Sequence, residues 1–75
     1  MNRKLIISTD ISDNLNFINL NNILKNDDIS NGIKDRNMVI DIKNAKENQI
    51  ELYGYDHELK YKTFVLSVEE IMKIL

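Results

Sequence analysis

Residues 50–66 read IELYGYDHELKYKTFVL, and this stretch decides the fold because it has the pattern of a β-hairpin. Pairing Tyr55 with Glu58 closes a two-residue loop. Pairing Asp56 with Leu59 gives the same sorting of side chains, because side chains alternate between the two faces of a strand. One face collects Ile50, Leu52, Gly54, Leu59, Tyr61, Thr63 and Val65. The other collects Glu51, Tyr53, Tyr55, Lys60, Lys62 and Phe64.

The aromatic and basic residues of the second face form the candidate partner-binding site: Tyr53, Tyr55, Lys60, Lys62 and Phe64. Tyrosine is among the commonest anchors of protein interfaces. Aromatic rings flanked by lysines can also stack bases and hold the phosphates of single-stranded nucleic acid. A third interpretation is structural, in which another element such as the amino-terminal segment covers this face. The pattern leaves all three interpretations open.

A further strand precedes the hairpin. Met38, Ile40 and Ile42 alternate with Val39, Asp41 and Lys43, which is typical of a half-buried strand. We expect Ile42 to pair with Ile50. In the same register Ile40 pairs with Leu52, and the result is a three-stranded antiparallel meander with its apolar residues on one face.

The amino-terminal half is less regular. Residues 4–8 form a short apolar run with branched Ile6 and Ile7, which favours a strand buried on both faces. In residues 14–26, apolar side chains at positions 17, 20 and 24 predict a helix. Several asparagines in this segment are poor helix formers, so a strand over residues 15–20 is the alternative.

Residues 26–37 have the composition of a loop. Asp27, Asp28 and Ser30 are followed by the pair Asn31 and Gly32. That pair can supply a type I′ turn or the carboxy-terminal cap of a helix. Polar flanks argue against a regular hairpin at this position.

The carboxy terminus carries a helix signal. Ser67 and Glu70 are spaced as a capping box, in which each side chain bonds the backbone N–H of the other residue. Apolar residues at positions 68, 71, 72 and 75 share one helical face. We therefore expect one α+β domain spanning residues 1–75, with a mainly antiparallel sheet of three to four strands and a short carboxy-terminal helix.

Length and composition limit how stable this domain can be. The chain has 75 residues, of which 43% are hydrophobic, and no cysteine. A domain of this size buries only roughly 60% of the surface of its unfolded chain, so self-association as a homodimer is one route to added stability. The absence of cysteine fits a reducing compartment and excludes thiolate metal sites.

Charge and hydropathy narrow the range of partners. The formal net charge is −2, which provides no long-range attraction for nucleic acid or an anionic membrane. No apolar stretch approaches the roughly 20 residues of a membrane span. We expect a cytoplasmic protein that binds no membrane.

Catalytic groups are sparse. His57 is the one histidine, so a histidine-based metal cluster cannot form within a single chain. Asp56, His57 and Glu58 are adjacent in sequence, and neighbouring residues in a tight turn do not converge on one metal or substrate. Asp27 and Asp28 lack further spaced ligands for a cation. We expect no enzyme activity, no metal and no cofactor.

The amino-acid composition points to an AT-rich genome, because isoleucine, asparagine and lysine have AT-rich codons whereas alanine, proline, glycine and arginine have GC-rich ones. Isoleucine, asparagine and lysine make up 31 of the 75 residues, whereas alanine, proline, glycine and arginine make up 5. With its small size and missing catalytic groups, the chain resembles, at the level of class, the accessory proteins of phages and plasmids, including anti-CRISPR inhibitors. That resemblance implies binding to a host or phage protein, such as a nuclease complex of host defence. The alternative is a regulatory binder of single-stranded RNA or DNA.

Overall fold

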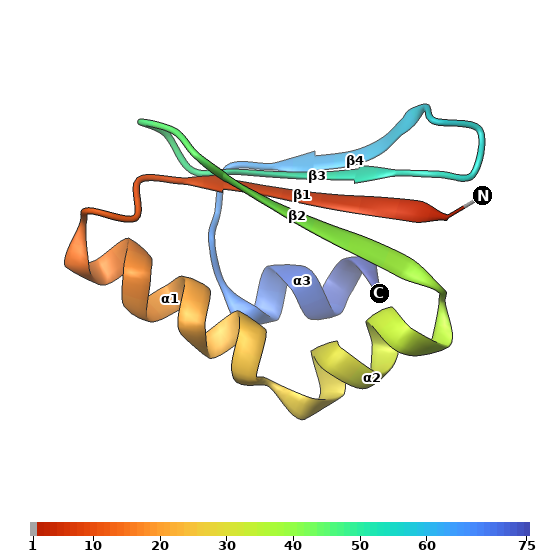
Figure 1. Ribbon diagram of the computed structural model, residues 1–75, viewed down its shortest axis with the longest axis horizontal. Helices are drawn as coiled ribbons and strands as arrows, with labels where there is room; N and C mark the ends of the chain where they lie inside the picture. The colour runs from red at the N-terminus through yellow and green to blue at the C-terminus, as the bar shows by residue number, and fades with distance from the viewer. Residues whose placement is uncertain (1) are drawn as a thin grey trace.

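The computed structural model describes residues 2–75. Four strands form one sheet, and three helices pack on one of its faces (Figure 1). The strands are β1 (Arg3–Thr9), β2 (Met38–Asn44), β3 (Gln49–Tyr53) and β4 (Leu59–Thr63). The helices are α1 (Asn14–Lys25), α2 (Asp27–Asp35) and α3 (Val68–Ile74). The α+β class, the sheet and the short carboxy-terminal helix are as predicted.

The strand order is β2-β1-β3-β4, so the predicted meander is wrong. β1 lies between β2 and β3, parallel to β2 and antiparallel to β3. Ile7 of β1 pairs with Ile42 on one side and with Ile50 on the other. The residues expected to be direct partners therefore lie in the same row of the sheet, but with a β1 residue between them. Parallel neighbours need a long crossover connection, and α1 and α2 supply it.

The centre of β1 is buried on both faces, as its apolar run predicted, whereas Lys4 is exposed and Ser8 is half-buried. Leu5 and Ile7 are fully buried against the helices, and Ile6 on the opposite face is only 9% exposed. β1 has a paired strand at each edge, β2 and β3, so its backbone groups are bonded on both sides.

Residues 14–25 are helical, so the strand alternative for residues 15–20 is wrong. The side chain of Asp13 accepts a hydrogen bond from the backbone N–H of Asn16 and caps the helix. Leu20 and Ile23 are the buried residues of α1. These two core contacts and the cap outweigh the poor helix propensity of the asparagines.

Residues 27–35 are helix α2, so the loop predicted for residues 26–37 is wrong. Asn26 caps the helix by accepting a hydrogen bond from the N–H of Ile29 at 3.0 Å. Asp27 and Asp28 occupy the first turn, where negative charge favours the helix. Gly32 lies inside the helix and not in a turn or cap. A Cβ atom there would lie 3.1 Å from Cδ1 of Leu75, so Gly32 leaves room for the carboxy-terminal side chain.

The hairpin between β3 and β4 has a three-residue loop and not the predicted two-residue loop. Gly54 donates its N–H to the carbonyl of Glu58, and His57 donates its N–H to the carbonyl of Gly54, both at 3.0 Å. His57 has a φ of 64°. A turn followed by a residue in the left-handed conformation, here His57, is a common form of three-residue hairpin loop. Farther from the tip, Leu52 pairs with Tyr61 as expected from the Tyr55 and Glu58 pairing.

A shift in the pairing register beside Tyr53 separates the three-residue loop at the tip from the regular pairs of β3 and β4. Tyr53 pairs with Leu59, whereas Leu52 pairs with Tyr61, so Lys60 is an extra residue on β4. Leu59 consequently shares a face with Tyr53, and the side chain of Lys60 lies against Gly54. Leu52 and Tyr61 lie on one face and Glu51 and Lys62 on the other, as predicted. Leu59 and Lys60 have exchanged the faces that were predicted for them.

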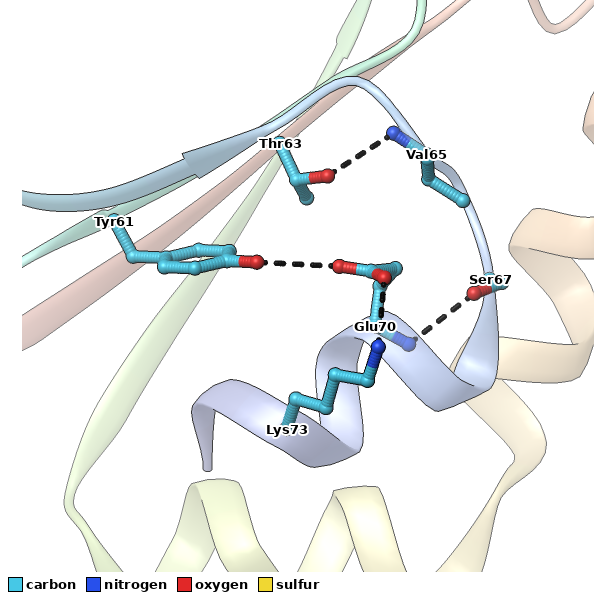
Figure 2. A network of polar contacts seen from close by, with 6 residues as sticks. All are labelled: Tyr61, Thr63, Val65, Ser67, Glu70 and Lys73. Carbon is cyan, nitrogen blue, oxygen red and sulfur yellow. Dashed lines mark hydrogen bonds and ion pairs between the residues drawn. The ribbon is translucent and has the colours of Figure 1, made fainter.

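Helix α3 begins with the predicted cap but without the full capping box (Figure 2). Oγ of Ser67 accepts a hydrogen bond from the N–H of Glu70 at 3.2 Å. The carboxylate of Glu70 accepts from the hydroxyl of Tyr61 at 3.2 Å and from Lys73 at 3.3 Å. Glu70 therefore links α3 to β4 and does not close the reciprocal bond of a capping box.

Replacing Ser67 by alanine is expected to lower the free energy of unfolding by roughly 0.5–2 kcal/mol, because the N–H of Glu70 loses its acceptor. Chemical unfolding followed by circular dichroism measures the change. Ser67→Asp is the matched control, since aspartate also accepts at this position and should leave stability nearly unchanged. Equal loss in both variants would contradict a capping role for Ser67.

One hydrophobic core fills the space between the sheet and the helices. Its fully or nearly fully buried members come from two strands, all three helices and the β4–α3 connection: Leu5, Ile7, Leu20, Ile23, Ile29, Ile50, Leu66 and Ile71. At one end of the sheet the buried hydroxyl of Thr9 donates to Oδ1 of Asn48 at 2.7 Å, and Asn48 donates to Asn16 at 3.1 Å. These asparagine contacts join β1, the β2–β3 turn and α1.

Candidate protein-binding face

The sheet face opposite the helices has no element packed on it in the described part of the chain (Figure 1). Strand alternation and the observed pairing assign its side chains. We call this surface the open face, and it consists of Lys4, Ile6, Ser8, Val39, Asp41, Lys43, Gln49, Glu51, Tyr53, Leu59 and Lys62. The amino-terminal segment, which could have covered this surface, instead forms the central strand of the sheet.

The structure divides the five predicted site residues into two groups. Tyr53 and Lys62 lie on the open face, on neighbouring strands. Phe64 follows β4 and is 62% exposed, and Nζ of Lys62 lies 5.4 Å from the centre of its ring. Tyr55 and Lys60 are at the hairpin tip and are not part of the open face.

Tyr55 and Lys60 belong to a separate cluster at the tip. The guanidinium of Arg3 lies 5.1 Å from the centre of the Tyr55 ring, and the hydroxyl of Tyr55 donates to the backbone carbonyl of Arg36 at 3.4 Å. Lys60 donates to Asp56 at 2.8 Å. This bond lowers the pKa of Asp56 and raises the pKa of Lys60. These contacts hold the turn against the amino end of β1 and the end of α2.

Four of the five charged residues on the open face are arranged in neighbouring pairs of opposite sign, and Lys43 is the fifth. Nζ of Lys4 lies 3.8 Å from the carboxylate of Asp41. Lys62 is directly opposite Glu51 in the register of β3 and β4. The hydroxyl of Tyr53 donates to Glu51 at 2.8 Å, and this bond raises the pKa of Tyr53. The face therefore offers a mixture of charges and not a basic surface.

Apolar side chains also lie on the same face, at both edges and on β1. Val39 is 44% exposed on the β2 edge, and Leu59 is 46% exposed on the β4 edge. Ile6 lies on β1, one of the two strands between these edges, where it lines a small hollow with Lys4, Tyr53 and His57. Sequence reasoning missed Ile6, Val39 and Leu59 as site residues. The alternation of β2 already placed Val39 among polar residues and could have identified it.

A second group of exposed apolar side chains lies on or beside α1. Its members are between 42% and 65% exposed: Ile11, Leu15, Phe17, Ile18 and Leu24. Only Leu20 and Ile23 of this helix are buried. The sequence pattern suggested a helix here but not that most of its apolar residues would remain exposed.

The described residues contain no group of three or more histidine, cysteine, aspartate or glutamate side chains placed to hold a metal ion. His57 is exposed at the hairpin tip. Its neighbour Asp56 accepts from the N–H of Glu58 at 3.1 Å and from Lys60, and so serves the turn. Over residues 2–75, no helix has the length and hydrophobicity needed to cross a membrane.

Comparisons with protein-family models, with curated proteins and with solved structures found no match to this chain.

Proposed function

We propose that this protein is a non-catalytic binding protein that attaches to another protein through its open face. The observation that carries the proposal is that all three helices pack on one side of the sheet, which leaves Tyr53 half-buried and Val39 and Leu59 exposed on the other side. Tyrosine and apolar side chains surrounded by paired charges form the common composition of a protein interface, with an apolar centre and a polar rim.

Paired charges favour a protein partner over single-stranded nucleic acid. A phosphate-binding surface gains affinity from cations that neutralise phosphates. On the open face Lys4 lies near Asp41 and Lys62 lies opposite Glu51, so phosphates would compete with carboxylates for two of its three lysines. The third lysine of this face is Lys43. The formal net charge of −2 adds no long-range attraction.

We further propose, as the most concrete role, a phage- or mobile-element-encoded inhibitor of a host defence enzyme, such as a nuclease complex, acting in the host cytoplasm. An inhibitor of this anti-CRISPR-like class needs no catalytic group, because it acts by occupying a surface of its target. Support comes from the small size, the AT-rich coding and the uncovered face of the sheet.

The binding proposal is tested with purified, tagged protein and host lysate. We expect one discrete protein to be retained, and we expect Tyr53→Ala and Lys62→Glu each to reduce its recovery, because both residues lie on the open face. Lys34→Glu changes the same charge on the exposed side of α2 and is the matched control. Equal recovery with all three variants would contradict binding through the open face.

Two further measurements separate the roles. A labelled single-stranded oligonucleotide should show no mobility shift at physiological salt. Tight, salt-sensitive binding without a protein partner would favour the nucleic-acid alternative.

Expression in cells that carry a defined defence system should restore plating of a targeted phage, and Tyr53→Ala should reduce that effect. Unchanged plating across a panel of defence systems would contradict the inhibitor role.

A further inference from the structure

We propose that β2 pairs with β2 of a second copy of this chain, antiparallel and centred on Ile42, so that two four-stranded sheets become one continuous sheet. The proposal rests on the free edge of β2, on the direction of its backbone groups and on the charges of Asp41 and Lys43. It concerns the β2 edge, which includes Val39, Asp41 and Lys43 of the open face, and it does not depend on the proposed function.

The two edges of the sheet differ in how well they are protected. β4 has an extra residue at Lys60 and carries a second lysine at position 62, and both irregularity and lysine discourage edge pairing. β2 carries one lysine, Lys43, and pairs with β1 without a register shift over residues 38–44. A regular edge strand with free backbone groups is a template for pairing with another chain.

The backbone of β2 presents its even-numbered residues outward. The N–H of Ala45 donates to the carbonyl of Thr9 at 3.0 Å, which shows that residue 45 faces β1. Successive residues of a strand direct their N–H and C=O groups to opposite sides. Ile40, Ile42 and Asn44 therefore direct theirs to the free edge.

Antiparallel registers centred on residues 40, 41, 42 or 43 place these outward groups opposite one another, and side-chain charge selects among them. A centre at Lys43 puts two lysines face to face, which is unfavourable. A centre at Asp41 puts two aspartates face to face, which is unfavourable. A centre at Ile40 puts Val39 opposite the aspartate of the other copy. A centre at Ile42 puts Asp41 opposite Lys43 of the other copy, twice by symmetry, and Val39 opposite Ala45.

The chosen register also covers apolar surface. Ile42 is 39% exposed on the helix side of the sheet, and Val39 is 44% exposed on the open face. At the symmetry axis Ile42 meets Ile42 of the second copy. The backbone N–H and C=O groups of Ile40 pair with those of Asn44 in the second copy. The outward backbone groups of Ile40, Ile42 and Asn44 therefore all gain hydrogen-bond partners.

A charge exchange tests the register. The mass in solution, followed by light scattering over a dilution series, should approach twice the 8.8 kDa of one chain. Lys43→Asp should weaken dimerisation about tenfold, because like charges replace both cross-strand pairs. The double variant Asp41→Lys with Lys43→Asp should restore it. Lys34→Asp, which makes the same charge change on α2, should leave dimerisation unaffected.

Cysteine crosslinking gives an independent readout, because the chain has no native cysteine. Ile42→Cys should form a disulfide dimer with air and a copper phenanthroline catalyst, since residues paired across an axis have Cα atoms within reach of a disulfide. Val39→Cys on the same strand should not, because two such residues would be roughly 20 Å apart. A monomer at all concentrations, or crosslinking of Val39→Cys in place of Ile42→Cys, would overturn the proposal.

Discussion

Replacing Ile50 by aspartate is expected to unfold the protein. Ile50 is fully buried on β3, where it faces the helices beside Ile7. A carboxylate at this position loses its hydration without gaining a partner, at a cost of about 4 kcal/mol or more. A domain of this length has a free energy of unfolding of about 4–11 kcal/mol. Circular dichroism at 25 °C should therefore show loss of the native spectrum.

The matched control is Leu59→Asp, which makes a similar apolar-to-acidic change on β4. Leu59 is 46% exposed and lies opposite Tyr53 on the open face, so its replacement should cost about 1 kcal/mol or less. A regular two-residue hairpin would instead turn Leu59 toward the helices. Unfolding of Leu59→Asp would therefore contradict the extra residue at Lys60.

The hairpin and the last helix could be predicted because their signals are local. The pairing of Leu52 with Tyr61 follows from alternation over neighbouring residues, and the cap at Ser67 follows from a motif of four residues. The strand over residues 38–43 was also recognised by its alternation. In each case the residues that determine the structure are close together in the sequence.

The position of β1 could not be predicted in the same way. Ile42 and Ile50 satisfy the apolar pattern equally well as direct partners or with Ile7 between them. Placing β1 between β2 and β3 does not change which of their side chains lie on which face of the sheet. Alternation along a strand predicts only these faces and does not predict which strands are neighbours. The choice depends on contacts between residues far apart in sequence, including the crossover through two helices.

Helix α2 was missed because its signals have two meanings. Asparagine, aspartate, serine and glycine favour turns, but asparagine and aspartate also favour the first positions of a helix. The sequence pattern assigns Gly32 to a turn or a helix cap, whereas its small size accommodates Leu75 from the other end of the chain. No local pattern reveals a contact between residues so distant in sequence.

The candidate site was predicted in part, and one residue explains the difference. An extra residue in a strand moves every later side chain to the other face. The irregularity at Lys60 removes that lysine from the open face and brings Leu59 to it, and the longer loop removes Tyr55. Tyr53 and Lys62 lie on opposite sides of the irregularity and stay on the predicted face.

Replacing Ile29 by alanine is expected to lower the free energy of unfolding by about 2–5 kcal/mol. Ile29 is 1% exposed and belongs to the core between α2 and the sheet. Removing most of its side chain leaves a cavity that the surrounding helices fill only in part. Urea unfolding followed by circular dichroism should show a lower midpoint with a similar slope.

Ser30→Ala is the control for this prediction because Ser30 is exposed on the next position of the same helix. Alanine has the better helix propensity, so this variant should keep or raise stability by up to about 0.5 kcal/mol. In a polar loop over residues 26–37, Ile29→Ala would cost little and Ser30→Ala would bring no gain in helix propensity. Closely similar unfolding curves for the two variants would contradict the helix and its place in the core, whereas the expected separation locates Ile29 inside a packed helix.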